Sequence, residues 1–275
     1  MKFLATVLLS LALTFTPHSR ATENSSTIRV GTWNAKRLGH GRKDYESMAR
    51  VIEANFDAVA LQEVMNETGL VELLEYLPGW DASLSGRVGR TGYYERYAVL
   101  ARKNRVSISR FSVVPDPTDM WLREPAVACL RGSHVDFCLV ITHTVYGSSL
   151  SARDREITAL SRLMGQLRRN DREGDYILVG DFNRSGRAVS FSSFLDVGYT
   201  FADSGITPTT LGEKNYASPY DHVLRDPVAT WEMHGKAERI DVVRSACKGS
   251  FTGCRELISD HAPLVFTLED SRDDD

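Results

Sequence analysis

Five short apolar runs in this 275-residue sequence are each followed by a side chain that can bind a cation or move a proton. These side chains are Asn34, Glu63, His143, Asp181 with Asn183, and Asp260 with His261. Carboxylate and amide oxygens are hard ligands that suit Mg²⁺. Imidazole exchanges protons near neutral pH, as general acid–base catalysis requires. Because ligands and catalytic groups gather at the ends of scaffold strands, the set predicts a shared site that can bind a metal and move protons.

The stretch Gly180-Asp181-Phe182-Asn183 shows why these side chains must be considered together. Residues 176–179 are apolar and rich in strand formers, so they indicate a buried strand that delivers Asp181 and Asn183 to its end. Side chains two residues apart on a strand point the same way. Alone, an Asp-x-Asn after a strand is more often a turn, and a lone histidine is more often structural than catalytic. Five such strand ends in one chain favour a shared site.

The elements that must position these residues alternate between strand-like and helical patterns. Hairpins occur among them, so the pattern predicts an α/β sandwich with mixed sheets and not a purely parallel sheet. The predicted strands cover residues 27–33, 56–61, 96–102, 105–114, 126–130, 135–142, 176–179, 221–224, 240–243 and 264–268, and the predicted helices cover 44–54, 69–77, 151–169 and 189–197.

The amino-terminal residues 1–21 have the pattern of a signal peptide. A lysine at position 2 precedes an apolar run, and small residues stand at the −3 and −1 positions of a cleavage site after Ala21. Cleavage there removes Lys2 and Arg20, which changes the formal net charge from −3 to −5. Net charge therefore gives no sign of a nucleic-acid-binding protein, and such a function would need a local basic surface.

The full sequence has ordinary globular composition, with 42% hydrophobic and 25% charged residues, and we expect residues 22–275 to form one domain with a disordered acidic tail. Four cysteines in an exported chain predict disulfides. We favour the local pairs Cys129–Cys138 and Cys247–Cys254, although four cysteines allow three connectivities. Neither spacing is Cys-x-x-Cys, which makes a zinc site a weaker interpretation.

The motifs Thr32-Trp33-Asn34, Leu61-Gln62-Glu63-Val64, Thr142-His143-Thr144, Gly180-Asp181-Phe182-Asn183 and Ser259-Asp260-His261-Ala262-Pro263 occur in this order. Together they resemble the endonuclease/exonuclease/phosphatase superfamily from about Ile28 to Leu268. Three further segments are most similar to its deoxyribonuclease I branch: 93–98, 123–127 and 220–222. The resemblance implies an α+β, four-layer sandwich of two mixed β-sheets flanked by helices. It also implies metal-dependent hydrolysis of a phosphodiester.

The resemblance assigns roles to individual side chains. The implied main Mg²⁺ ligand is Glu63, with Asn34 near it. The residues implied to bind a second metal or to orient the phosphate are Asp181, Asn183 and Asp260. The implied acid–base pair is His143 and His261, held by Glu95 and Asp221 respectively. The implied substrate contacts are Arg123, Tyr93 and Lys36, and we add Arg96 from the basic residues around the tyrosine segment. These roles make chemical sense, because phosphodiester hydrolysis needs charge stabilisation, an activated water and a protonated leaving oxygen.

One departure from the branch concerns the substrate. The branch has a minor-groove arginine after its Glu-Val pair, whereas this chain has Met65, which can wedge against bases but cannot hydrogen-bond their edges. Basic residues at 36–37 and 42–43 follow the first strand and fit phosphate contacts to a polymer.

The sequence therefore predicts an exported, Mg²⁺-dependent endonuclease with low sequence specificity that acts on DNA. Mn²⁺ is an alternative activator, and a structural Ca²⁺ is implied by the resemblance alone. We expect a monomer without stable membrane association, in the periplasm or outside the cell. The alternatives are a phosphodiesterase of the same superfamily acting on phospholipid or phosphoinositide, a nuclease toxin subunit, or a binding protein on an inactive hydrolase scaffold. Lipid-active relatives are expected to carry exposed aromatic and apolar loops, which are not evident here.

Overall fold

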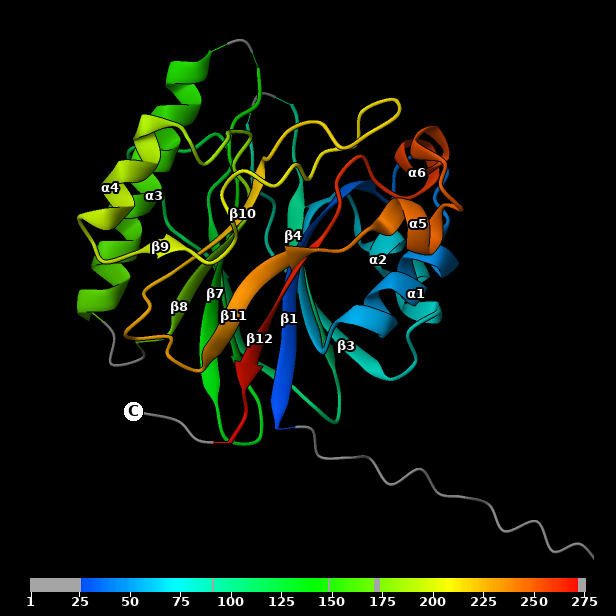
Figure 1. Ribbon diagram of the computed structural model, residues 1–275, viewed down its shortest axis with the longest axis horizontal. Coiled ribbons are helices and arrows are strands. Elements are labelled where there is room, and N and C mark those ends of the chain that lie inside the picture. Colours follow the sequence, from blue (N-terminus) through cyan, green and yellow to red (C-terminus); the bar gives the residue numbers. More distant parts are fainter. Residues whose placement is uncertain (1–25, 91, 148, 171–173, 272–275) are drawn as a thin grey trace, which may run out of the picture.

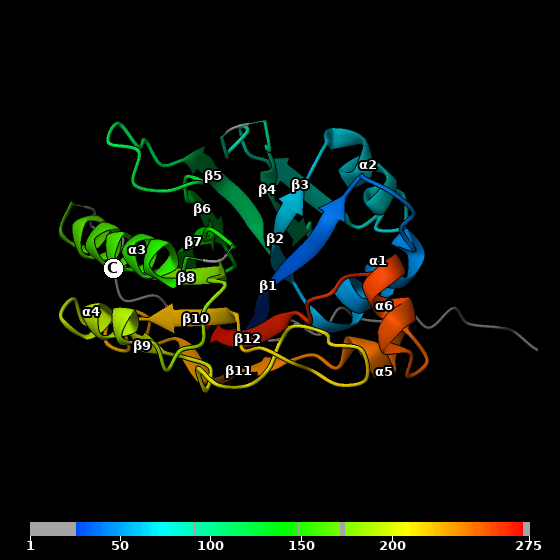
Figure 2. The ribbon, with the colours of Figure 1, turned by 90° about the horizontal axis from the view of Figure 1, so that it is seen from above.

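The computed structural model describes residues 26–90, 92–147, 149–170 and 174–271. Two six-stranded mixed sheets pack face to face, and helices cover both outer faces (Figures 1 and 2). This is the predicted four-layer α+β sandwich. The predicted signal segment, residues 1–21, and residues 272–275 of the acidic tail lie outside the described residues.

The first sheet has the strand order β11-β12-β1-β2-β4-β3. β1 (Thr27–Leu38) runs parallel to β2 (Ala58–Val64), and the other neighbours in this sheet are antiparallel. The remaining strands are β3 (Trp80–Leu84), β4 (Arg96–Arg102), β11 (Met233–Arg239) and β12 (Leu264–Glu269). Because β1 and β2 are parallel, their carboxyl ends lie at the same edge of the sheet.

The second sheet has the order β5-β6-β7-β8-β10-β9. β7 (Asp136–His143) runs parallel to β8 (Tyr176–Asp181), and the other pairs are antiparallel. The remaining strands are β5 (Ser107–Val113), β6 (Ala126–Arg131), β9 (Thr200–Phe201) and β10 (Asp221–Arg225). The second sheet therefore repeats the arrangement of the first, with one central parallel pair.

Each sheet has its own helical cover (Figure 2). The first sheet packs against α1 (Tyr45–Asn55), α2 (Glu67–Glu75), α5 (Val242–Ala246) and α6 (Phe251–Leu257). The second packs against α3 (Leu150–Asn170), the 3₁₀ helix η1 (Val189–Phe191) and α4 (Ser192–Leu195). Among the described residues, we find no helix that is both long and apolar enough to cross a membrane.

The central core lies between the sheets and is built by strand alternation. On β1, Ile28 and Val30 point into this core, whereas Trp33 packs under the helices on the outer face. All three side chains are fully buried. Burial of each large apolar side chain contributes roughly 1.5–3 kcal/mol to the free energy of folding relative to exposure. A strand such as β1 is therefore stabilised on one face by the opposite sheet and on the other by the helices.

Several elements differ from the sequence-based prediction, which contained no counterpart of β3, β9 or α6. Residues 240–243 were predicted as a strand, but the strand β11 ends at Arg239 and a helix, α5, begins at Val242. The Asp241 side chain accepts the backbone N–H of Arg244, which is a helix N-cap that competes with strand formation. β11 itself was missed because it lies at a sheet edge and exposes most of its central residues.

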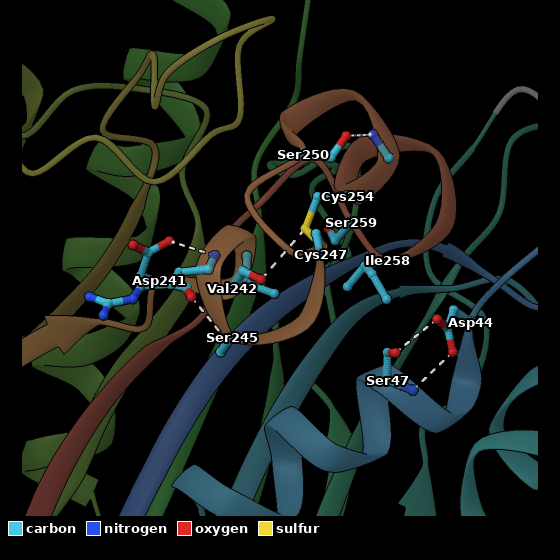
Figure 3. The surroundings of a disulfide bond; sticks show 12 residues. Asp44, Ser47, Asp241, Val242, Ser245, Cys247, Ser250, Cys254, Ile258 and Ser259 are labelled. Atoms are coloured by element: carbon cyan, nitrogen blue, oxygen red, sulfur yellow. Dashed lines mark hydrogen bonds between the residues drawn. A yellow bond between two sulfur atoms is a disulfide. The ribbon is translucent and has the colours of Figure 1, made fainter.

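Two disulfides join the cysteines that are close in sequence. Cys129 pairs with Cys138 across the antiparallel strands β6 and β7, and Cys247 pairs with Cys254 between α5 and α6. Figure 3 shows the second disulfide, with Asp241 and Ser250 at the starts of the two helices. The carbonyl of Cys254 also accepts the backbone N–H of Ser259. This disulfide therefore braces the segment that leads to His261.

Candidate active site

The predicted catalytic residues continue the inner faces of the two sheets. His143 and Asp181 are the last residues of β7 and β8 and are register partners. Ile141 and Val179, two residues earlier on each strand, belong to the core between the sheets. Because side chains two residues apart share a face, the core becomes polar where these strands end. The same alternation applies to three more residues, because each lies an even number of positions from a side chain of this core. They are Asn34 on β1, Glu95 just before β4 and Asp221 on β10.

Glu63 reaches the site by a different route. Strand alternation from Val59 and Leu61, which pack under the helices, would direct its side chain away from the site. Instead, Glu63 adopts a left-handed backbone with φ of 57°, and the pairing of β2 with β4 shifts register between Leu61 and Val64. Its carboxylate then accepts hydrogen bonds from Asn34 Nδ2 at 3.0 Å and from the backbone N–H of Arg37 at 3.0 Å.

Left-handed backbone is concentrated at this site. Six non-glycine residues in the described ranges have a positive φ, and four of them, Lys36, Arg37, Glu63 and Asn183, line one cleft. Such conformations cost roughly 1–3 kcal/mol each and cluster where function requires them. Gly180 also has a positive φ, of 139°, and a Cβ there would lie 2.0 Å from the Thr142 carbonyl oxygen. Glycine is therefore required directly before Asp181.

The two histidines have matching surroundings. His143 Nδ1 lies 2.7 Å from Glu95 Oε1, and His261 Nδ1 lies 2.7 Å from Asp221 Oδ2. The Nε2 atoms of both histidines lie 3.6 Å from the same atom, Asp181 Oδ2. A carboxylate on Nδ1 fixes the ring and leaves Nε2 as the atom that exchanges a proton. The two reactive nitrogens therefore converge on one point.

Buried charges shift the pKa values of these groups. Burial alone would lower the pKa of His261, but the carboxylates of Asp221 and Asp181 outweigh it and raise the pKa to about 10. The pKa of His143 is likewise raised, because the Glu95 carboxylate outweighs burial. Burial raises the pKa of Asp181 despite the attraction of both histidines. Without a bound cation, the site therefore favours protonated histidines.

This shift predicts how the stability of the metal-free protein depends on pH. The His261 pKa is about 10 in the folded protein against 6.5 for the free side chain. Its contribution to the free energy of unfolding is therefore complete below pH 6.5 and is lost as the pH rises toward 10. We expect the free energy of unfolding, measured with urea in EDTA, to fall between pH 7 and pH 9 in the wild type. The fall should be smaller in His261→Gln, which lacks the titrating imidazole. Equal losses in the two proteins would contradict the assignment.

A divalent cation fits the donor set at this point. Ligand atoms of Asp181, Asp221 and His261 lie within 4.8 Å of one another, and Asp221 Oδ1 is buried without a hydrogen-bond partner among the described residues. Glu63 is joined to Asp181 through Asn34, whose Nδ2 donates to both carboxylates, at 3.0 and 3.1 Å. Carboxylate oxygens are the ligands that hard divalent cations prefer.

The two asparagines take supporting roles in this arrangement. Asn34 Oδ1 accepts the backbone N–H of Lys36 at 2.9 Å, while its Nδ2 donates to the carboxylates of Glu63 and Asp181. Asn183 Nδ2 donates to the Thr144 carbonyl at 2.9 Å, and its backbone N–H donates to Asp181 Oδ1 at 2.8 Å. Both asparagines therefore hold the carboxylates in position.

A cleft of about 460 Å³ contains these groups. Nine of the predicted site residues line it: Lys36, Glu63, Tyr93, Arg123, His143, Asp181, Asn183, Asp260 and His261. Asn34, Glu95 and Asp221 lie behind the lining and hold its members by hydrogen bonds. Arg96 is not part of the lining, and its Nη1 donates to the Ser85 carbonyl at 2.6 Å.

The structure also brings into the lining residues that were not among the predicted site residues. Further lining residues are Arg37, Tyr146, Thr210, Leu211, Ser218 and Tyr220. Tyr146 follows the strand end at His143 by three residues, and Tyr220 directly precedes Asp221. Proximity to a predicted strand end was therefore the signal that could have found both tyrosines.

Cations surround the carboxylates of the cleft. Arg123 is buried, binds Glu95 Oε2 through Nε at 2.8 Å, and places its guanidinium 5.6 Å from the centre of the Tyr93 ring. Lys36 Nζ lies 3.6 Å from Asp260 Oδ2. The cleft thus offers carboxylates for a cation, positive charge for an anion and two imidazoles for proton transfer. This combination defines a hydrolase of phosphate esters.

Comparison with known proteins agrees with this class. The family described as Endonuclease/Exonuclease/phosphatase family matches residues 31–261, and the chain belongs to this family. A deoxyribonuclease from Thioalkalivibrio sp. (strain K90mix) is 32% identical, with 88% of this chain and 71% of that protein covered. Deoxyribonuclease-1-like 1 from Sus scrofa is 31% identical, with 89% of this chain and 82% of that protein covered.

Solved structures share the fold. A humanized TDP2 from D. rerio superposes with a TM-score of 0.64 at 19% identity, covering 89% of this chain and 99% of that chain. An endonuclease/exonuclease/phosphatase family protein from Bacteroides thetaiotaomicron superposes with a TM-score of 0.61 at 18% identity. The match covers 88% of this chain and 97% of that chain.

Proposed function

We propose that the protein is an exported, divalent-metal-dependent endonuclease that hydrolyses phosphodiester bonds in DNA with low sequence specificity. The observation that carries this proposal is the convergence of the two histidine Nε2 atoms on Asp181 Oδ2, each at 3.6 Å. The resemblance to proteins named deoxyribonuclease, at 31–32% identity, supports DNA as the substrate.

The side chains of the cleft divide the work of hydrolysis. One imidazole removes a proton from the attacking water, and the other donates a proton to the leaving oxygen as the P–O bond breaks. Glu95 and Asp221 orient these rings and stabilise their charged forms. Arg123 brings a fixed positive charge to the wall of the cleft. A bound Mg²⁺, or Mn²⁺, held by Glu63 and Asp181 would neutralise charge on the phosphate.

A neighbouring basic pocket supports a polymeric substrate. A second cavity of about 350 Å³ shares Lys36 and Arg37 with the cleft. Its other lining residues are His40, Gly41, Arg42, Lys43 and Glu256. Burial and the nearby Lys36 charge lower the pKa of Lys43 to about 8, as expected where cations crowd together. Such a surface suits the phosphates that flank the bond to be cut.

Export is proposed from two features. Residues 1–21 have the pattern of a signal peptide, and the described part of the chain contains two disulfides. Disulfides form and persist in oxidising compartments such as the periplasm and the cell exterior.

The test of this function is a substrate panel. The protein lacking residues 1–21 is incubated with supercoiled plasmid, single-stranded DNA, RNA and sphingomyelin, each with Mg²⁺ or with EDTA. We expect Mg²⁺-dependent nicking of the plasmid that EDTA abolishes, because the carboxylates of the cleft cannot neutralise the phosphate by themselves. Hydrolysis of sphingomyelin without nicking of DNA would replace the proposal with the lipid alternative.

A further inference from the structure

Tyr146 is an exposed aromatic side chain inside the catalytic cleft. It follows β7 by three residues and lines the same cavity as His143, Asp181 and His261. Its exposed fraction is 67%, larger than that of Tyr93 at 39% and the largest of any phenylalanine, tyrosine or tryptophan in the described ranges. An apolar ring that remains exposed beside a reactive centre is a candidate contact for substrate.

The ring of Tyr146 is nevertheless held in place. The Arg153 guanidinium lies 5.0 Å from the ring centre, and Arg153 itself is buried. Arg153 Nη1 donates to the backbone carbonyl of Asn183 at 2.8 Å, and Nη2 donates to the carbonyl of Gly147. One buried cation therefore ties the tyrosine to the loop that carries Asn183, whose backbone N–H holds the Asp181 carboxylate.

Tyr93 shows the same arrangement. Its ring lies 5.6 Å from the guanidinium of Arg123, which is also buried. Tyr93 precedes β4 of the first sheet, whereas Tyr146 follows β7 of the second. The cleft thus receives one arginine-backed tyrosine from each sheet. Flat aromatic rings in a groove with positive charge are the arrangement that binds unpaired bases by stacking.

From this arrangement we propose that Tyr146 stacks on a nucleobase next to the phosphate being cut. The ligand class is single-stranded or locally unpaired DNA, because bases inside an intact duplex stack on one another and offer no free face. The inference rests on the proposed nuclease function and deepens it. It also fits the chain's Met65, which cannot hydrogen-bond base edges in a duplex groove.

The experiment compares Tyr146→Ala with the wild type on three substrates in Mg²⁺. These are a single-stranded oligonucleotide, the same sequence as a duplex, and an oligomer of abasic tetrahydrofuran residues. We expect the variant to lose roughly 5- to 100-fold in kcat/KM on the single strand, mainly through KM, since a base–aromatic stack is worth that much. The other two substrates should change by less than about twofold. Tyr146→Trp should retain activity on the single strand, because the larger ring also stacks.

The matched control is Tyr76→Ala, which removes a tyrosine that is 51% exposed outside the cleft and should leave all three activities unchanged. Equal losses on the three substrates, or no loss on the single strand, would overturn the inference. Binding of fluorescein-labelled oligo(dT) in EDTA gives a readout that does not need catalysis. If the wild type cuts no DNA, the proposed function fails, and weaker oligo(dT) binding by Tyr146→Ala would still support stacking.

Discussion

Replacing His143 or His261 with alanine is expected to lower kcat for plasmid nicking by roughly 10²- to 10⁴-fold, which is the range for a positioned acid or base. The loss should appear in kcat more than in KM, because each imidazole acts on a proton in transit and not on the bound ground state. The double variant should lose little more than the stronger single variant, because the two rings act as a unit.

The control for these variants is a histidine outside the site. His234 lies on β11, pairs with Glu269 at 2.7 Å and has a side chain that is 56% exposed, so His234→Ala should keep wild-type activity. His143 is buried against Glu95, so the fold of His143→Ala has to be checked separately from its activity. We expect its circular dichroism spectrum to match that of the wild type. Wild-type nicking by a folded His143→Ala protein would rule out the proton-transfer role.

Much of the site could be predicted because strand alternation is a local rule. His143 and Asp181 end strands whose apolar residues already indicate an inner face, and the same spacing carries the polar side chains to that face. The two mixed sheets could be predicted for a similar reason, because hairpins and long helices leave distinct patterns in sequence. The pairing of each histidine with a carboxylate came from the family resemblance and not from spacing, because Glu95 and Asp221 are each about 40 or more residues from their partner.

The rest depended on interactions that a linear pattern does not contain. Strand alternation places Glu63 on the wrong face, and a left-handed residue at a register shift returns it to the site. Arg96 had the right charge next to Tyr93, yet its side chain donates to the Ser85 carbonyl and does not line the cleft. Tyr146 stands three residues after a predicted strand end, but the contact of its ring with Arg153, on the following helix, has no signal in the sequence. Each case is decided by a contact between elements and not by a residue type.

Replacing Glu63 with glutamine should cause the second large effect. The side chain keeps its size and one carbonyl oxygen, but it loses the negative charge that attracts a divalent cation. We expect the Mg²⁺ concentration for half-maximal nicking to rise by roughly 10- to 100-fold, as is typical when a group that supports a metal site is lost. At saturating Mg²⁺ the variant should recover part of its activity, which separates weaker metal binding from a lost proton transfer.

Thermal unfolding supplies a measurement of the same site that does not depend on activity. Mg²⁺ should raise the Tm of the wild type, because a ligand that binds the folded state stabilises it. The Tm of Glu63→Gln should respond only at the higher concentrations that its nicking requires. Glu67→Gln is the matched control, because Glu67 is an exposed carboxylate in the first turn of α2, four residues further along the chain. If Glu63→Gln and Glu67→Gln gave the same Mg²⁺ titration, Glu63 would not be a metal ligand, and Asp181 with Asp260 would have to bind the cation without it.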